Sequence, residues 1–275
     1  MRKVVVHGTS LSVSRFSFGT ASLHHLGCSR AQCAHLAAAA DCGFSHFDTA
    51  PLYGFGEAER AIGRAFGAST DVTVATKVGL YPPGGCEQSR PAVLARKALG
   101  RFFSPLSRAV ADLGVARARR SLEDSLRRLG RDRVDLLLLH EPDFGLCAAD
   151  EFQRWLQDEA GRVGAFGVAG PAAVVEPFVS RRSPLATVVQ TRDDIATREA
   201  DFMPANGRQL QFTYGYLGHC ADGLSAAEVL GRALERNASG SIVVSTRNRK
   251  RLDEFVRVAA EPRGESLEGK EASGC

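Results

Sequence analysis

The sequence predicts an eight-stranded parallel (β/α)8 barrel, a TIM barrel, and three observations support this fold class. Short β-rich segments alternate with segments of helical periodicity along most of the chain. Eight such pairs in 275 residues leave roughly 34 residues for each pair, which suits a closed barrel. A doubly wound open sheet is the competing fold, but its glycine-rich turn is missing after the first strands.

The elements follow from this alternation. Strands are predicted at residues 15–19, 45–48, 72–77, 135–140, 165–169, 187–191, 210–214 and 241–245. Helices are predicted at residues 30–42, 57–66, 116–129, 151–159, 172–180, 226–237 and 249–259. The segment after residue 191 has no clear helical pattern. Consecutive parallel strands need right-handed crossovers, so the helices should surround the barrel.

Three segments lie outside this repeat. Residues 3–7 and 11–14 flank Gly8-Thr9-Ser10 and predict a hairpin that caps the N-terminal end of the barrel. Residues 79–114 form a long connection rich in Pro, Gly and Arg, expected above the third strand. Residues 261–275 are charged and lack an apolar face, so we expect a disordered tail after a barrel domain at 1–260.

Composition excludes several classes of function. A net charge of +4 is mild, and the basic residues of segment 116–133 are expected on the solvated face of a helix, so no nucleic-acid partner is predicted. The apolar stripe of that helix is Val115, Leu122, Leu126 and Leu129, and the expected solvated residues are Arg117, Arg119, Arg120, Arg127, Arg128, Arg131 and Arg133.

The cysteines and the apolar runs predict a cytoplasmic protein. Seven scattered cysteines without a C-x-x-C pair argue against a disulfide framework and against a zinc site, so no metal is expected. No apolar run approaches the roughly 18 residues of a membrane span, and the run after Lys3 is too short for a signal peptide. Oligomeric state is not indicated.

Polar residues end three neighbouring predicted strands. Asp48, Lys77 and His140 close the second, third and fourth strands, and Tyr53 follows Asp48 in the next loop. Functional groups of a parallel barrel gather at the carboxyl ends of its strands, so these four can converge. Taken singly, each has a structural explanation: a turn cap, an exposed aromatic ring, a surface charge and a core histidine. Together they form a proton-transfer set.

The chemistry of such a set follows from the pKa of a phenol. At about 10 it is too high for easy proton donation at neutral pH, and a neighbouring ammonium lowers it. An aspartate beside the lysine keeps the lysine charged. A neutral histidine can hold a substrate carbonyl oxygen. General-acid catalysis by Tyr53, with electrostatic support from Lys77 and Asp48, is therefore the hypothesis.

These residues also carry a resemblance. The run Phe-Asp-Thr-Ala-Pro-Leu-Tyr-Gly at 47–54, with Glu57 and Glu59, resembles the signature of the aldo-keto reductase family around its catalytic Asp and Tyr. Residues 76–79 resemble the lysine strand of that family, and 121–129 with 135–140 resemble its third helix and histidine strand. Residues 242–252 resemble its last strand and helix start. The resemblance extends from about Val13 to Val258.

The resemblance implies an NADP-dependent oxidoreductase that interconverts an alcohol and a carbonyl, in an aldehyde, a ketone or a sugar. Tyr53 would be the acid, Lys77 and Asp48 its supporting partners, and His140 the group that orients the substrate. Arg247 and Arg251 would suit a 2′-phosphate, although a solvated helix start explains them equally well. The other cofactor-binding positions implied are Gln190, Tyr214, Tyr216, Leu217, Ser245 and Thr246.

Several cofactor positions depart from the family pattern. Ala169-Gly170 stands where the family has Ser-Asn to hold the nicotinamide carboxamide, and Ser245 replaces a usual lysine. Thr191-Arg192-Asp193 replaces the stacking aromatic that commonly follows the glutamine, and the closing loop after 218 is short. We therefore expect weaker cofactor binding than is usual, unless Tyr216 supplies the stacking ring.

A second function class remains open. A reductase-derived barrel with weak or no turnover, acting as a binding or regulatory protein, would also explain the altered cofactor positions. The four intact residues favour the enzyme. Arginines and a lysine in 79–114 would suit an anionic or polyhydroxylated substrate, but the substrate itself is not determined by the sequence.

Overall fold

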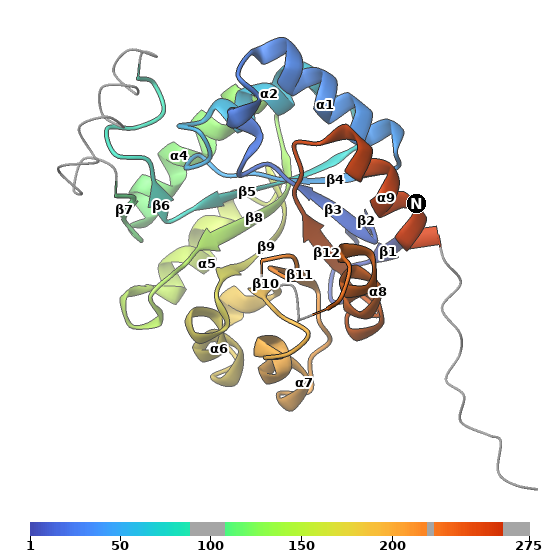
Figure 1. Cartoon of the computed structure of the whole chain (residues 1–275). Helices are drawn as coiled ribbons and strands as arrows, with labels where there is room; N and C mark the ends of the chain where they lie inside the picture. The colour runs from blue at the N-terminus through green and yellow to red at the C-terminus, as the bar shows by residue number, and fades with distance from the viewer. Residues whose placement is uncertain (89–107, 219–222, 261–275) are drawn as a thin grey trace, which may run out of the picture.

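The computed structural model describes residues 1–88, 108–218 and 223–260, and eight of its strands close into a parallel barrel (Figure 1). The strands follow one another around the barrel in the order β10, β11, β12, β3, β4, β5, β8, β9. Their bounds are β3 Phe16–Gly19, β4 His46–Asp48, β5 Thr73–Val78, β8 Val134–His140, β9 Val163–Gly170, β10 Val188–Arg192, β11 Phe212–Tyr214 and β12 Ser241–Val244. The predicted fold class is confirmed.

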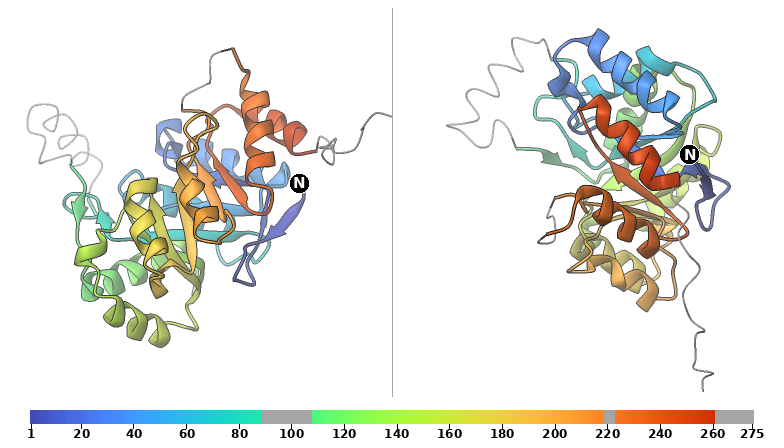
Figure 2. Two further views of the ribbon diagram at one scale, coloured as in Figure 1. Left: turned by 90° about the horizontal axis from the view of Figure 1, so that it is seen from below. Right: turned by 45° about the vertical axis from the view of Figure 1, so that its right-hand side comes forward.

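Helices connect successive strands on the outside of the barrel, as Figures 1 and 2 show. They are α1 Ser29–Asp41, α2 Glu57–Phe66, α4 Val115–Leu129, α5 Ala149–Asp158, α6 Ala172–Ser180, α7 Phe202–Ala205, α8 Ala226–Arg236 and α9 Arg249–Ala260. Short 3-10 turns lie at η1 Leu23–Leu26, η3 Phe144–Leu146, η4 Pro184–Ala186 and η5 Glu199–Asp201. Within the described ranges, every helix is too short or too polar to cross a membrane.

Strand alternation separates two hydrophobic layers. Leu137 and Leu139 of β8 pack outward against the helices, while Leu136 and Leu138 belong to a smaller cluster inside the barrel. The same period of two continues to His140, which therefore faces the barrel interior. Ala75 of β5 and Val188 of β10 are interior residues as well. Alternation therefore places Lys77 and Gln190, each two residues further on, on the interior face of the barrel.

The hairpin of β1 Lys3–Val5 and β2 Ser12–Ser14 closes one end of the barrel. Val6, Leu11 and Val13 are buried in the interior cluster together with Leu136 and Phe212. This confirms the predicted N-terminal cap. The hairpin and the antiparallel pair β6 Leu80–Tyr81 and β7 Val110–Ala111 lie on opposite sides of the molecule (Figure 2).

The β6–β7 pair was not expected, because the predicted connection at 79–114 lacks an alternating pattern. Asp112 donates its backbone N–H to the Gly79 carbonyl at 2.9 Å, which closes the base of this excursion. Residues 89–107 of the connection and the predicted tail at 261–275 lie outside the described residues. After β10, the chain without a helical pattern forms η5 and the four-residue α7.

The prediction for α4 is wrong in one respect. Arg127 is exposed as expected, but the side chains of Arg128 and Arg131 are only 6% and 8% exposed. Arg128 lies 2.7 Å from the buried carboxylate of Glu59 on α2, and Arg131 donates to the Ser69 carbonyl at 2.9 Å. Helical spacing assigns a face to a residue but does not reveal a buried acid on the neighbouring helix.

Candidate active site

A cavity of about 530 Å³ opens at the carboxyl ends of the barrel strands. Residues from all eight barrel strands or the loops that follow them line it, which is the usual place for a functional site in this fold. The lining includes Gly19, Asp48, Tyr53, Lys77, His140, Glu141, Gly170, Gln190, Tyr214, Tyr216, Leu217, Val244 and Ser245. All four predicted catalytic residues are among them.

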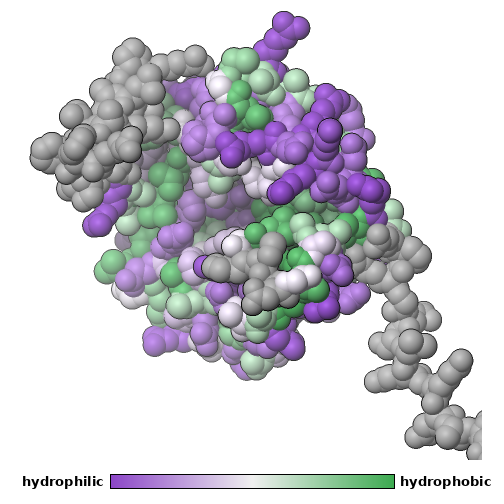
Figure 3. Space-filling view, viewed as in Figure 1, coloured by the Kyte–Doolittle hydropathy of each residue, from purple (hydrophilic) through white to green (hydrophobic). Residues whose placement is uncertain are grey.

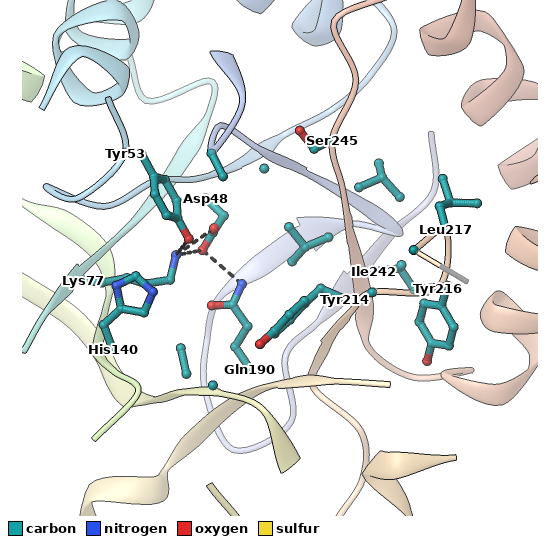
Figure 4. A pocket seen from close by; sticks show the side chains of 18 of the residues that line it. Asp48, Tyr53, Lys77, His140, Gln190, Tyr214, Tyr216, Leu217, Ile242 and Ser245 are labelled. Atoms are coloured by element: carbon teal, nitrogen blue, oxygen red, sulfur yellow. Dashed lines mark hydrogen bonds and ion pairs between the residues drawn. The ribbon is translucent and has the colours of Figure 1, made fainter. Parts of the chain in front are cut away.

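Lys77 is the centre of the polar cluster at the base of this cavity. Its ammonium nitrogen donates to Oδ1 and Oδ2 of Asp48 at 2.6 and 2.7 Å, and to the backbone carbonyl of Thr49 at 3.0 Å. The phenol oxygen of Tyr53 lies 3.3 Å from the same nitrogen (Figure 4). Asp48, Lys77 and Tyr53 therefore form one hydrogen-bonded unit, as the sequence predicts.

The β4–α2 loop sets the position of Tyr53. Thr49 donates its backbone N–H to the Ala75 carbonyl at 2.9 Å, which ties the loop to β5. Three consecutive left-handed residues, Gly54, Phe55 and Gly56, then turn the chain into α2. A Cβ on Gly54 would lie 2.7 Å from the Cβ of His24, so this position requires glycine for both its φ angle and its space.

Burial and charge act in opposite directions on the Tyr53 phenol. Burial raises its pKa and Asp48 raises it further, while Lys77 lowers it, and the net result is a pKa above the ordinary value. The sequence-based expectation of a lowered pKa therefore describes only the contribution of Lys77. Burial lowers the pKa of Lys77, but Asp48 and Tyr53 raise it above its usual value, so the lysine stays charged.

His140 is neutral in this environment. Burial and the charge of Lys77 lower its pKa to about 3. The imidazole and Tyr53 rings meet edge-on, with centroids 5.9 Å apart. Its Nδ1 is buried without a hydrogen-bond partner among the described residues. A neutral imidazole beside a phenol suits the orientation of an uncharged carbonyl oxygen.

Gln190 joins the same cluster from β10. Its Nε2 donates to Oδ1 of Asp48 at 3.0 Å (Figure 4), a contact that the sequence analysis did not anticipate. The buried Oε1 has no hydrogen-bond partner within the described ranges. One side of this amide is therefore fixed by Asp48, and the other presents an acceptor that a ligand N–H can satisfy.

The two tyrosines after β10 differ in their surroundings. Tyr214 ends β11 and lies beside Gln190 in the cavity, whereas Tyr216 lies apart from that cluster (Figure 4). Tyr216 is 2% exposed, packs in the outer hydrophobic layer and donates its hydroxyl to Asp193 at 2.6 Å. These contacts disfavour the expected stacking role of Tyr216 and leave Tyr214 as the available aromatic face.

The end of β12 supplies the remaining predicted positions. Ser245 lines the cavity and contacts Ser22 at 3.0 Å between their hydroxyl oxygens. Thr246 is buried, and its carbonyl lies 2.8 Å from Nε2 of His35. Arg247, before α9, and Arg251, in its first turn, are exposed and are not part of the cavity lining. In Figure 3 the surface shows hydrophilic residues gathered near the position of α9.

The sequence analysis did not identify two residues, Glu141 in the cavity wall and the buried Asp193. Glu141 lines the cavity directly after His140, and its position at a strand end is a signal that sequence analysis could have used. Asp193 is fully buried and binds both nitrogens of the Arg236 fork, at 2.6 and 3.0 Å. Nothing in its local sequence indicates this pairing, because Arg236 lies 43 residues away.

Comparison with known proteins identifies relatives over part of the chain. A 6-dehydroglucose reductase of Novosphingobium aromaticivorans is 30% identical over an alignment of 174 residues, which covers 58% of this chain and 49% of that protein. A D-threo-aldose 1-dehydrogenase of a Pseudomonas species is 36% identical over 141 residues, 48% of this chain and 42% of the relative. The matched segments thus span about half or less of the relatives' length.

Solved structures share the fold over nearly the whole chain. A glycerol dehydrogenase from Gluconobacter oxydans has a TM-score of 0.71 at 22% identity and covers 96% of this chain and 91% of its own. An aldo-keto reductase from Klebsiella pneumoniae in complex with NADPH has a TM-score of 0.63 at 17% identity, with 96% and 92% covered. Residues 15–174 match the family described as the aldo/keto reductase family. The chain therefore belongs to the aldo-keto reductase family.

Proposed function

We propose that this protein is an NADP(H)-dependent oxidoreductase that interconverts a small carbonyl compound and the corresponding alcohol. The observation that carries the proposal is the buried unit of Asp48, Lys77 and Tyr53 beside a neutral His140 at the base of an open cavity. A structural role alone does not explain a buried ammonium held against a phenol at the wall of a cavity.

In the direction of reduction, a nicotinamide cofactor bound in the cavity would supply hydride to the carbonyl carbon. The Tyr53 hydroxyl donates its proton to the carbonyl oxygen, and the resulting phenolate lies 3.3 Å from the Lys77 ammonium. Asp48 keeps that ammonium in place and charged. In oxidation the same phenolate accepts the proton of the alcohol, so Tyr53 serves as general acid and general base.

The raised pKa of free Tyr53 makes the phenol a weak acid, so proton donation depends on a group that stabilises the phenolate. Burial keeps the phenol protonated in the ligand-free site. Proton transfer then creates a phenolate beside Lys77, where the opposite charge stabilises it. His140, neutral because its pKa is about 3, positions the carbonyl oxygen without competing as a charged acid at neutral pH.

The residues present fit a nicotinamide cofactor. The orphaned Oε1 of Gln190 offers an acceptor to a carboxamide N–H, and the Tyr214 ring offers a stacking face. Leu217 and Ser245 also line the cavity. Arg247 and Arg251 are exposed near the start of α9 and suit a 2′-phosphate. The altered positions at Ala169 and Gly170 support weaker than nanomolar affinity, which NADPH fluorescence titration measures.

The substrate class proposed is an aldehyde, a ketone or a sugar. Relatives that match this chain in part include a 6-dehydroglucose reductase and a D-threo-aldose 1-dehydrogenase, which supports a small carbonyl or sugar substrate. The cavity of about 530 Å³ leaves room for such a molecule beside a nicotinamide ring.

The test is NADPH oxidation by the purified protein with a panel of aldehydes, ketones and sugars. Tyr53→Phe removes only the hydroxyl and should lower the rate by about a hundredfold or more. Tyr81→Phe is the matched control, because this tyrosine is buried on β6 and is not part of the cavity lining. A wild-type protein inactive on every substrate would favour a binding or regulatory role.

A further inference from the structure

Glu141 holds an unusual backbone position at the wall of the cavity. It follows the last residue of β8 with a φ of 48°, in the left-handed region that non-glycine residues seldom adopt. Its backbone N–H donates to the Ala169 carbonyl at 2.7 Å, which ties it to β9. Backbone strain of this kind is often held at functional sites, where neighbouring contacts enforce it.

The register of the barrel places Glu141 beside the end of β9. Ala169 pairs with His140 on one side and with Gln190 on the other, so these three residues lie at one level. At the next level Gly170 pairs with Thr191, and Gly170 has no side chain. A Cβ on Gly170 would lie 3.5 Å from Cγ of Glu141, so the glutamate side chain lies directly over this glycine.

Among the described cavity-lining residues, Glu141 has no partner of opposite charge. Three cavity-lining residues in the described ranges carry charge, and two of them, Asp48 and Lys77, are paired with each other at 2.6 Å. The Glu141 carboxylate makes no hydrogen bond or ion pair with another described residue. Burial is the main cause of the raised pKa values of Tyr53 and Tyr214, and the charge of Glu141 adds to the rise in both.

A carbonyl group at Tyr53 would have its substituents next to this negative charge. A carboxylate substituent would be repelled, whereas a cationic one would be attracted and could also lie over the Tyr214 ring. Granted the proposed carbonyl reduction, we propose that Glu141 is a specificity-determining residue that selects substrates carrying a positive charge near the reacting carbonyl. The basic residues that suggested an anionic substrate, Arg90, Arg96, Lys97 and Arg101, lie outside the described residues.

Three benzaldehydes test the proposal in steady-state assays with NADPH. At the para position the first carries a trimethylammonium group, the second the isosteric neutral tert-butyl group and the third a carboxylate. Intrinsic reactivity differs among them, so the measured quantity is the ratio of kcat/KM for the cationic and neutral aldehydes, compared between wild type and Glu141→Gln. We expect this ratio to fall about tenfold in the variant, which corresponds to about 1.4 kcal/mol.

The controls separate local charge from net charge. Glu123→Gln makes the same charge change on the exposed face of α4 and should leave the ratio unaltered. Relative to the neutral aldehyde, the carboxylate aldehyde should become a better substrate in Glu141→Gln. An unchanged cationic-to-neutral ratio, with turnover retained, would overturn the assignment of Glu141.

A binding measurement keeps this inference separate from the proposed reaction. Calorimetric titration of the NADPH-saturated protein with the cationic and neutral benzyl alcohols measures binding without turnover, because cofactor and alcohol are then both in the reduced state. Tighter binding of the cationic alcohol to wild type, lost in Glu141→Gln, supports the charge selection even if no aldehyde is reduced. Equal binding of the two alcohols to wild type overturns it, whereas inactivity on the whole panel of aldehydes, ketones and sugars overturns only the reductase proposal.

Discussion

Arg128 on α4 donates its Nε–H to Oε2 of Glu59 on α2 at 2.7 Å, and both side chains are buried. The other oxygen of Glu59 accepts a hydrogen bond from the Thr76 hydroxyl at 2.6 Å. Thr76 points outward from β5 immediately before Lys77. One buried carboxylate thus connects two helices to the strand that carries the central lysine of the site.

Arg128→Met should destabilise the protein strongly. The change leaves the fully buried Glu59 carboxylate without its guanidinium partner, which costs about 3–5 kcal/mol in the free energy of unfolding. The matched control is Arg127→Met, because the Arg127 side chain is 72% exposed and its loss should change stability by about 0.5 kcal/mol or less. Urea denaturation of both variants measures the difference, and equal effects would contradict a structural role for the buried pair.

Asp48→Asn should move the alkaline limb of the pH–activity profile to lower pH. In the wild type, burial lowers the pKa of Lys77 but Asp48 raises it. Without that carboxylate the pKa of Lys77 falls, and the neutral lysine no longer stabilises the Tyr53 phenolate. Profiles of kcat/KM against pH measure the shift. Asp124→Asn on α4 serves as control, and coincident alkaline limbs in wild type and Asp48→Asn would refute the coupling.

Because of His46, the free energy of unfolding should decrease as the pH falls from 6.5 to 5. It is buried and hydrogen-bonded to Thr73 at 2.8 Å, and burial together with Lys77 lowers its pKa to about 3. The unfolded histidine has a pKa near 6.5, so below this pH the unfolded state binds a proton that the folded state does not. Between pH 6.5 and 5 this costs about 2 kcal/mol for one such histidine.

Urea denaturation at several pH values tests this contribution. His46→Asn should lose about 2 kcal/mol less than wild type between pH 6.5 and 5, whatever its stability at pH 7. His7→Asn is the control, because His7 is exposed in the turn of the N-terminal hairpin. Parallel pH dependence in wild type and His46→Asn would show that His46 does not remain neutral when folded.

Leucine variants of Tyr214 and Tyr216 should distinguish a residue that stacks on the cofactor from one that packs in the core. Tyr214→Leu removes the aromatic face in the cavity and should weaken NADPH binding about five- to tenfold. Tyr216→Leu removes a buried ring and the hydrogen bond to Asp193, so it should lower the free energy of unfolding but leave the NADPH dissociation constant within about twofold. Fluorescence titration and urea denaturation read these two effects, and the reverse pattern would assign stacking to Tyr216.

Strand alternation explains why much of the site could be predicted. Asp48, Lys77 and His140 stand at the ends of recognisable strands, and a parallel barrel brings such ends together. Tyr53 follows within the short run that resembles the family signature. The prediction of Tyr216 as a stacking residue is less well supported, because sequence position alone does not show that a hydroxyl is bound to Asp193.

The sequence by itself determined the barrel, its hairpin cap and the four polar residues that end its strands or follow them, because period-two strands and strand-end polar residues are local signals. Only the tertiary structure decided the pairing of Arg128 with Glu59, the sign of the Tyr53 pKa shift and the place of Glu141 in the cavity wall. These properties depend on burial and on partners that are distant in the chain. The energy of a charge depends on its distance to other charges and on the dielectric of its surroundings, and local sequence spacing shows neither.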